Sequence, residues 1–288
     1  MHNFTRRVFF CGILCFFGII LTPTEKLKAN EYFDTGVFLG ASHYYGDLQQ
    51  DVLHTNQTHP YMSAYLRFSP NEYLSFRGSF SYGRISGADS NHTSPGRRNR
   101  NLSFKNDIYE VSLIGEWNLF GFDFVSMHND NFTPYVFAGL GFFKHNPKAK
   151  YDDEWVELKP LSTEGQGLPD YPERQPYSLY QVSIPHGVGL KYQFSTSIAL
   201  SMEVSPRKTF TDYLDDVSTD HVDQELLRQR RGELAASLAD RSDELPQFDD
   251  PQNQEGRQRG NPDDEDWYVF VGVTLSINLS EYYCPLQH

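Results

Sequence analysis

Apolar and polar residues alternate along most of the chain after residue 30. Residues 74–82 read LSFRGSFSY, which places Leu74, Phe76, Phe80 and Tyr82 on one side and serine or arginine on the other. A period of two is the signature of a β-strand. The same alternation recurs along the chain, and it predicts strands at 32–41, 61–68, 74–85, 108–119, 133–143, 179–194, 198–207 and 267–279.

The composition of the two strand faces predicts the architecture. One face is aromatic or aliphatic, and the other mixes serine, glycine, arginine and glutamate. A soluble sandwich would need a core for the apolar faces and no such core is evident, so we predict an all-β, eight-stranded antiparallel transmembrane β-barrel of the OmpA/OmpX-like kind. The predicted lipid face includes Phe76, Phe80, Val111, Leu113, Leu200, Met202, Val204, Val269, Val271 and Val273.

The polar face carries charges of both signs. Glu110, Glu116 and Glu203 share it with Arg77 and Arg207. The interior of an eight-stranded barrel is filled by its own side chains, and an unpaired buried charge costs several kcal/mol. We therefore predict a plug of ion pairs in preference to a conducting pore.

The amino terminus has the pattern of a secretory signal peptide. Arg6 and Arg7 precede an apolar run over residues 8–21, and the small residue Ala29 follows. A retained membrane helix would need about 20 apolar residues, so we assign residues 1–29 to the signal. Their removal takes away four basic side chains and one acidic one, which moves the net charge from -13 to -16 and excludes nucleic acid as an expected partner.

The connections between the predicted strands alternate in length. Those at 69–73 and 195–197 are tight and 120–132 is intermediate, whereas 42–60, 86–107, 144–178 and 208–266 are long. The last contains a stretch of helical composition at 222–239. Bacterial barrels keep short turns in the periplasm and long loops outside. We therefore expect a barrel over residues 30–279 in the outer membrane of a Gram-negative cell, with both termini and a tail at 280–288 in the periplasm.

Candidate catalytic and metal-binding residues lie in the long loops. His43, His54 and His59 could be combined with Asp212, Asp215 and Asp216, but no serine nucleophile elbow accompanies them. We expect no enzymatic activity and no cofactor. The run from Asp212 to Asp220 could offer carboxylates to calcium, but it lacks the spacing and the glycine of an EF-hand. It predicts a solvated or salt-bridged face in preference to a metal site.

Several loop segments distinguish the chain from a generic barrel. They are 40–48 (GASHYYGDL), 163–167 (TEGQG), 207–218 (RKTFTDYLDDVS), 259–261 (RGN) and 266–268 (DWY). Taken in order, they resemble the PorG family, the outer-membrane barrel subunit of the Bacteroidota type IX secretion system, over about residues 32–285. The resemblance implies association with a periplasmic ring lipoprotein and support for export of cargo, including gliding or virulence proteins.

The two most specific segments supply the candidate binding residues Glu164, Gln166, Arg207, Lys208, Asp212, Asp215 and Asp216. We expect Arg207 and Lys208 at the barrel rim to form charge-assisted hydrogen bonds with Glu164 or with the carboxylates of 212–216. Such contacts could order the loops, bind a partner, or do both.

Cys284 is the one cysteine left after signal removal, since Cys11 and Cys15 precede residue 29. In the periplasm it could be buried, free, or bonded to another chain. We favour a disulfide to the ring lipoprotein, with outer-membrane lipids as the other expected partner. The alternative function is a stand-alone OmpA/OmpX-like barrel that acts as an adhesin or a narrow pore.

Overall fold

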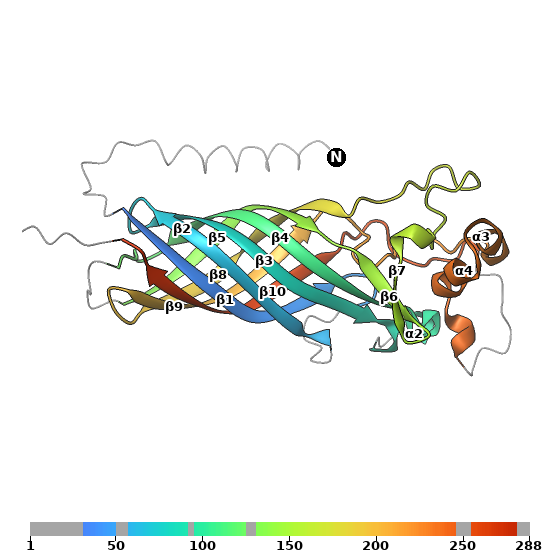
Figure 1. The fold of residues 1–288 in the computed structure, drawn as a ribbon, viewed down its shortest axis with the longest axis horizontal. Coiled ribbons are helices and arrows are strands. Elements are labelled where there is room, and N and C mark those ends of the chain that lie inside the picture. The colour runs from blue at the N-terminus through green and yellow to red at the C-terminus, as the bar shows by residue number, and fades with distance from the viewer. Residues whose placement is uncertain (1–30, 50–56, 92–94, 125–130, 246–254, 281–288) are drawn as a thin grey trace, which may run out of the picture. The chain divides into compact units, whose positions relative to one another are not determined.

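A computed structural model describes residues 31–49, 57–91, 95–124, 131–245 and 255–280. All eight predicted strands are present in it. They are β1 (Tyr32–Tyr45), β2 (His59–Ser69), β3 (Leu74–Ala88), β4 (Ser103–Asn118), β5 (Phe132–Lys144), β8 (Tyr180–Gln193), β9 (Ile198–Thr209) and β10 (Trp267–Asn278). Each pairs antiparallel with the next, and β1 pairs with β10, so the sheet closes into a barrel (Figure 1).

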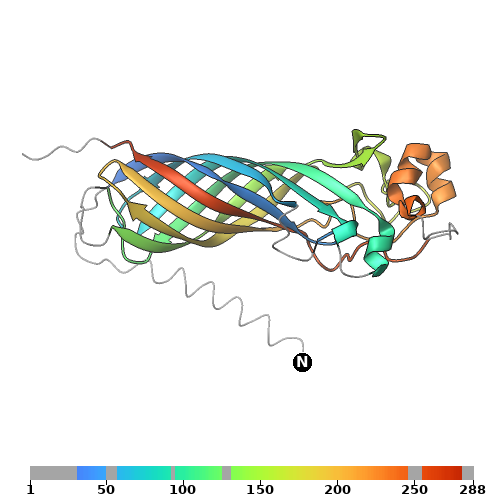
Figure 2. The same cartoon turned by 90° about the horizontal axis from the view of Figure 1, so that it is seen from below.

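The strands cross the barrel at a steep angle. Followed once round the barrel, the register that starts at Phe33 returns to β1 at His43, ten residues further along. For eight strands this stagger corresponds to a tilt of about 40°, which is typical of outer-membrane barrels. Figure 2 shows the tilt from a second direction.

The outer surface carries the predicted lipid face. All ten predicted residues lie on the outward parity of their strands, and Phe80, Val111, Leu113 and Met202 are more than half exposed. Exposed aromatic side chains gather near the short-turn end (Phe33, Phe76, Trp117, Phe132, Tyr192) and again toward the loops (Tyr109, Phe142, Tyr180). An aliphatic band between two aromatic girdles is the outer surface of a barrel that spans a membrane.

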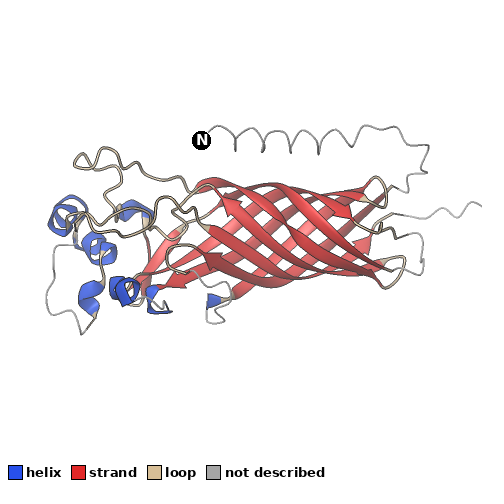
Figure 3. Ribbon diagram, turned by 180° about the vertical axis from the view of Figure 1, so that it is seen from behind, coloured by secondary structure: helices blue, strands red, loops and turns tan. Residues whose placement is uncertain are grey.

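The long connections gather at one end of the barrel, and the short ones lie at the other (Figure 3). The loops carry a hairpin of β6 (Pro147–Tyr151) and β7 (Glu154–Glu157), which extends β4, as well as α2 (Pro95–Arg100) and the short turns η3 (Asp89–Asn91), η4 (Lys159–Leu161) and η5 (Ser242–Glu244). The predicted helical stretch forms two helices, α3 (Gln224–Arg231) and α4 (Glu233–Ala239), because Gly232 adopts a φ of 93° between them. No helix in the described part of the chain is long and apolar enough to cross a membrane.

Arginine placed in the aliphatic band should destabilise the barrel according to its depth. Leu113 lies midway along β4 between Tyr109 and Trp117, whereas Phe120 follows that strand beside the short-turn girdle. Their exposures match, at 64% and 67%. We expect Leu113→Arg to cost about 2–4 kcal/mol relative to Leu113→Ala, and Phe120→Arg about 0–1 kcal/mol relative to Phe120→Ala. Reversible unfolding from lipid vesicles measures both differences, and equal costs at the two sites would contradict the assigned lipid face.

Candidate functional site

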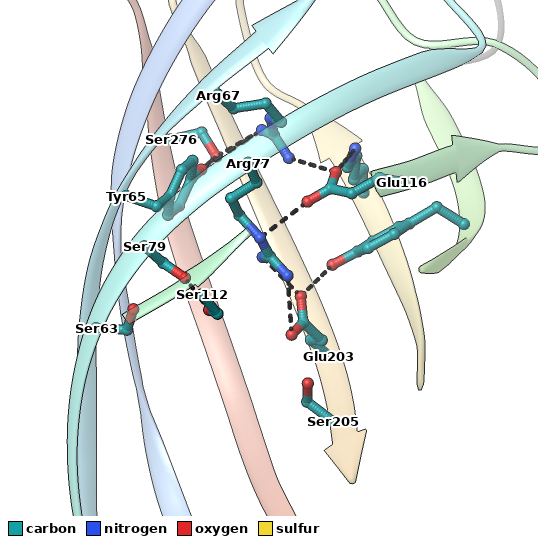
Figure 4. Close-up of polar contacts among 12 residues, drawn as sticks. Ser63, Tyr65, Arg67, Arg77, Ser79, Ser112, Glu116, Glu203, Ser205 and Ser276 are labelled. Atoms are coloured by element: carbon teal, nitrogen blue, oxygen red, sulfur yellow. Dashed lines mark hydrogen bonds and ion pairs between the residues drawn. The ribbon is translucent and has the colours of Figure 1, made fainter. Parts of the chain in front are cut away.

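The barrel interior holds a network of buried charges centred on Glu116. The Glu116 carboxylate is contacted by Arg67 Nη1 at 3.0 Å and Arg77 Nε at 3.0 Å (Figure 4), and by Lys191 Nζ at 2.6 Å. All four side chains are at most 6% exposed. One carboxylate among three cations would be unbalanced, so the network must extend further.

Two more carboxylates supply the balance. Asp34 takes a bidentate pair from Arg67, at 2.9 and 2.8 Å, and Glu203 takes a bidentate pair from Arg77, at 2.8 and 3.2 Å. Tyr135 also donates to Glu203 at 2.9 Å. Three acidic and three basic groups therefore neutralise each other across strands that are far apart in sequence. The predicted plug of ion pairs is confirmed, and it includes Asp34, Arg67 and Lys191, which the sequence analysis missed although they follow the same alternation.

A second buried pair lies closer to the loops. Arg207 directs its guanidinium to Glu110 at 3.3 Å, and Tyr268 donates to the same carboxylate at 2.7 Å. The expected contact of Arg207 with Glu164 or the 212–216 carboxylates is thus wrong. Arg207 shares strand parity with Glu203, so its side chain enters the lumen. Lys208, of opposite parity, pairs with Glu265 at 3.2 Å and lies over the Trp267 ring.

Above the barrel, the long loops are held together at Glu164, which is fully buried. Its carboxylate accepts from Arg259 Nη1 at 2.9 Å, from the backbone N–H of Ser218 at 2.9 Å, and from Thr219 Oγ1 at 2.9 Å. Arg259 also donates to the carbonyl of Asp216 at 2.6 Å. Arg259 therefore takes the role that the sequence analysis gave to Arg207 and Lys208. Its segment, 259–261, was singled out, but nothing in the sequence assigns its partner.

Asp216, in the loop 208–266, is also fully buried. Its carboxylate accepts hydrogen bonds from the Thr163 hydroxyl and from Tyr177 at 2.6 Å. Its backbone lies in the left-handed region, with a φ of 69°, which a non-glycine residue tolerates only where its surroundings hold it. The signature segments 163–167 and 207–218 are therefore joined directly by hydrogen bonds. The expectation that Asp216 would be solvated or salt-bridged is wrong, because its carboxylate is buried and accepts from two hydroxyl groups.

A third buried group consists of the Tyr44 hydroxyl and the carboxyls of Asp215 and Asp266. The Tyr44 hydroxyl lies 2.7 Å from Asp215 Oδ2 and 2.6 Å from Asp266 Oδ1. A hydroxyl has one hydrogen, so it can donate to only one of the two carboxyls, and the other must carry a proton to donate in return. Burial raises the pKa of Asp215 and of Asp266 well above the usual range, and the charges of neighbouring aspartates raise both further.

Asp212 completes the acidic cluster. It is 9% exposed, and neither of its carboxylate oxygens accepts a hydrogen bond from a residue that the structure describes. Burial, with the negative charges of Asp215 and Asp47, raises the pKa of Asp212 to about 9. Burial likewise raises the pKa of Asp216 to about 6, against the opposing charge of Arg259. The buried carboxylates at the loop end are therefore neutralised partly by Arg259 and partly by bound protons.

The remaining candidates add little chemistry. Gln166 is 2% exposed and accepts from the N–H of Glu164 at 3.1 Å. His59 contacts Ser86 at 2.7 Å and His43 contacts Thr58, so neither approaches Asp212 through a described contact. His54 and Cys284 lie outside the described residues. Among the residues that are described, no three His, Cys, Asp or Glu side chains are placed to hold a metal ion.

Most of the site residues predicted from the sequence are therefore buried. Glu164, Gln166, Arg207, Asp212, Asp215 and Asp216 are at most 9% exposed, and Lys208 is 40% exposed. We call the buried assembly of Tyr44, Glu164, Asp212, Asp215, Asp216, Arg259 and Asp266 the loop clasp. Its residues come from three of the four long loops, 42–60, 144–178 and 208–266, and their contacts order these loops relative to the barrel. Any partner would meet the surface that the clasp shapes and would not touch these carboxylates directly.

The loop clasp should loosen as pH rises. Its aspartates have folded-state pKa values above the usual value of about 4, reaching about 6 for Asp216 and about 9 for Asp212. The folded loops then hold more protons than the unfolded loops between about pH 4 and pH 9, so their free energy of unfolding falls through that window. Proteinase K digestion of the barrel in proteoliposomes should cleave the loops faster at pH 9 than at pH 5.

A neutral isostere tests the cause of this pH dependence. Asp212→Asn removes the titration of the aspartate whose pKa is raised to about 9, so the loops of this variant should resist digestion better at alkaline pH and show a flatter profile. Glu225→Gln alters an exposed acid on α3 and serves as the control, with a profile like that of the unmodified protein. A steep profile in Asp212→Asn, identical to that of the parent, would contradict the assignment of the proton to Asp212.

Comparison with solved structures finds small outer-membrane proteins. They include Ail of Yersinia pestis, solved in complex with the heparin analogue sucrose octasulfate (10% identity, TM-score 0.40, covering 86% of this chain and 99% of that one). Neisserial surface protein A (8%, 0.42, 85% and 96%) and OprG from Pseudomonas aeruginosa (7%, 0.37, 87% and 99%) are others. No curated protein matches the chain in sequence.

A family model does match most of the chain, over residues 10–238. The match takes in the signature segments at 40–48, 163–167 and 207–218, and it ends within α4. The chain therefore belongs to the family described as Domain of unknown function (DUF6089).

Proposed function

We propose that this protein is a non-enzymatic subunit of the type IX protein secretion machinery, anchored in the outer membrane and associated with the periplasmic ring lipoprotein. The proposal starts from the resemblance of the loop segments to the PorG family. The observation that carries it is that these segments form one structural unit. Short motifs that matched by chance would have no reason to meet.

Each signature segment contacts another through a polar side chain. The first, at 40–48, contributes Tyr44, which reaches Asp215 and Asp266, and Asp47, whose Oδ2 accepts from the N–H of Asn261 at 2.7 Å. The third loop reaches the last through Glu164 and Arg259. The resemblance therefore rests on residues that depend on one another, which favours a shared loop architecture over scattered similarity.

The filled lumen favours an anchoring role over a conducting one. Arg67, Arg77 and Lys191 cross the interior to Glu116 and to its neighbouring carboxylates, and all are nearly inaccessible. Opening a passage would break several buried ion pairs together, at a cost of about 3–5 kcal/mol for each partner removed. A barrel of this kind acts through the surfaces at its two ends, as expected for a subunit that holds other components at the membrane.

The two ends then have separate assignments. The short turns, with the chain termini and Cys284, are assigned to the periplasm, where the ring lipoprotein lies, and the long loops to the cell exterior. Support comes from the usual orientation of bacterial barrels. A stand-alone adhesin or narrow pore remains the competing function, and it predicts normal secretion when the protein is removed.

Deletion of the gene should abolish export of type IX cargo while unrelated outer-membrane barrels keep their abundance. Because the lumen is filled, we attribute the loss of export to loss of the assembled machine and not to loss of a conducting pore. Complementation with Asp212→Asn, a loop variant that leaves the lumen unchanged, should therefore restore export. Cargo in the medium and barrels in the membrane fraction are measured by quantitative proteomics. Normal cargo export in the deletion strain would exclude the secretion role and favour the stand-alone barrel.

Cys284 should form an intermolecular disulfide with the ring lipoprotein. An oxidising compartment and a single leftover cysteine are the physical reasons. Non-reducing electrophoresis of outer membranes should show a heavier species that disappears with reductant and in Cys284→Ser. Full alkylation of Cys284 in intact cells would contradict the bond. Copurification of the ring lipoprotein in mild detergent from the Cys284→Ser strain would show that association survives without it.

A further inference from the structure

The loop end of the molecule contains a polar cavity of about 360 Å³. It lies between α2, the end of α4 and residues 257–260. Every lining residue is charged, polar or glycine, and four are arginines: Arg97, Arg100, Arg257 and Arg259. Since none of the described residues that line the cavity has an apolar side chain, a polar or charged ligand suits it better than a lipid chain. The size is at the lower end of small-molecule sites.

Two of the arginines form a fixed wall. Arg100 makes two hydrogen bonds to Asp89, at 3.1 and 2.6 Å, and another to the carbonyl of Asp47 at 3.2 Å. Arg259, 2% exposed, is held by Glu164 and by the carbonyl of Ala239 at 3.1 Å. Asp89 and Glu164 neutralise these two guanidinium groups, so Arg100 and Arg259 shape the cavity wall. A negatively charged ligand would need a different cation to bind it.

Arg257 is the cation that can bind the negative charge of a ligand in this cavity. Its side chain is exposed at the cavity and forms no ion pair with any residue in the described part of the chain. Its backbone is fixed, because its carbonyl accepts from the N–H of His221 at 2.9 Å. A guanidinium carried on an ordered backbone beside a preformed cavity is suited to bind a carboxylate or a phosphate in bidentate fashion.

The cavity also has unmatched hydrogen-bonding capacity on its inner side. His221 is 5% exposed, and its Nδ1 has no hydrogen-bond partner among the described residues. Burial, with the charge of Arg259, lowers the pKa of His221 to about 4, so its ring is neutral at physiological pH. A neutral imidazole offers one donor and one acceptor, which matches a hydroxyl group. A buried polar atom without a partner costs free energy that such a ligand could recover.

We propose that this cavity binds one unit of an acidic saccharide, a hexose that carries a phosphate or a carboxylate. The acidic group would meet Arg257 at the rim, and the sugar hydroxyls would meet polar side chains such as Asn99, Asp240 and His221. The site does not depend on the secretion role. The saccharide could belong to lipopolysaccharide in the same membrane or to a soluble glycan, since both carry this chemistry.

Titration calorimetry on the full-length mature protein in detergent tests the proposal. The probes are glucose 6-phosphate and glucuronic acid, with glucose and inorganic phosphate as the neutral sugar and the bare anion. We expect saturable binding of both acidic sugars, at least tenfold tighter than that of glucose or of phosphate, because both halves of the ligand contribute.

Variants separate the site from general charge effects. Arg257→Ala should weaken binding of the acidic sugars about tenfold or more, as expected for loss of a charge-assisted pair. Arg231→Ala removes an exposed arginine from the end of α3, outside the cavity, and should leave binding unchanged. Asn99→Ala tests the hydroxyl contacts without changing charge, and should weaken the acidic sugars but not inorganic phosphate.

Four results would contradict an acidic-saccharide site. Failure of both acidic sugars to bind, equal binding of glucose, phosphate binding as tight as that of glucose 6-phosphate, or no effect of Arg257→Ala would each overturn the proposal. Where the acidic sugars bind as expected, competition by lipopolysaccharide micelles identifies the membrane as the source, and lack of competition identifies a soluble glycan. Either result is compatible with loss or retention of cargo export in the deletion strain, so the two proposals fail separately.

Discussion

The structure depends on the pairing of charges inside a wall that faces lipid. A closed barrel satisfies its backbone hydrogen bonds between strands, and its outer side chains must then be apolar. That leaves the lumen to hold the polar half of every strand. Glu116 meets Arg67, Arg77 and Lys191, and Asp34 and Glu203 restore neutrality. Because these residues come from β1, β2, β3, β4, β8 and β9, the network ties together strands that do not pair directly.

The same requirement is met differently in the loops. The chain is acidic overall, with a formal net charge of -13, and the loop clasp buries more carboxylates than arginine can neutralise. Arg259 donates to the Glu164 carboxylate and to the carbonyl of Asp216. Of Asp215 and Asp266, one accepts the Tyr44 hydrogen and the other must carry a proton of its own to donate to the Tyr44 oxygen. Protons supply the missing positive charge, so we expect the loop architecture to respond to pH. The lumen, with its matched ion pairs, has less reason to do so.

The strands could be predicted from sequence because the side-chain period of a strand is local. Leu113 and Ser112 differ in environment through parity alone, and the eight segments needed no knowledge of their partners. The loop contacts could not be predicted in this way. Glu164 and Arg259 are 95 residues apart, and nothing local distinguishes Arg259 from Arg257, one of which is buried and the other exposed. The predicted contact of Arg207 with the loop carboxylates was wrong although the sequence held the information against it, since strand parity already places Arg207 with Glu203 in the lumen.

The structural unit extends beyond the part of the chain that the family model matches. That match ends at residue 238, yet the barrel closes through β10, which pairs with β1 and β9. Glu164 lies inside the match and its guanidinium partner Arg259 outside it, and Tyr44 and Asp266 are divided in the same way. A chain that stopped at residue 238 would have an open sheet edge in lipid and buried carboxylates without their partners. The family's defining segments can therefore fold as seen here only together with a final strand and the loop that leads to it.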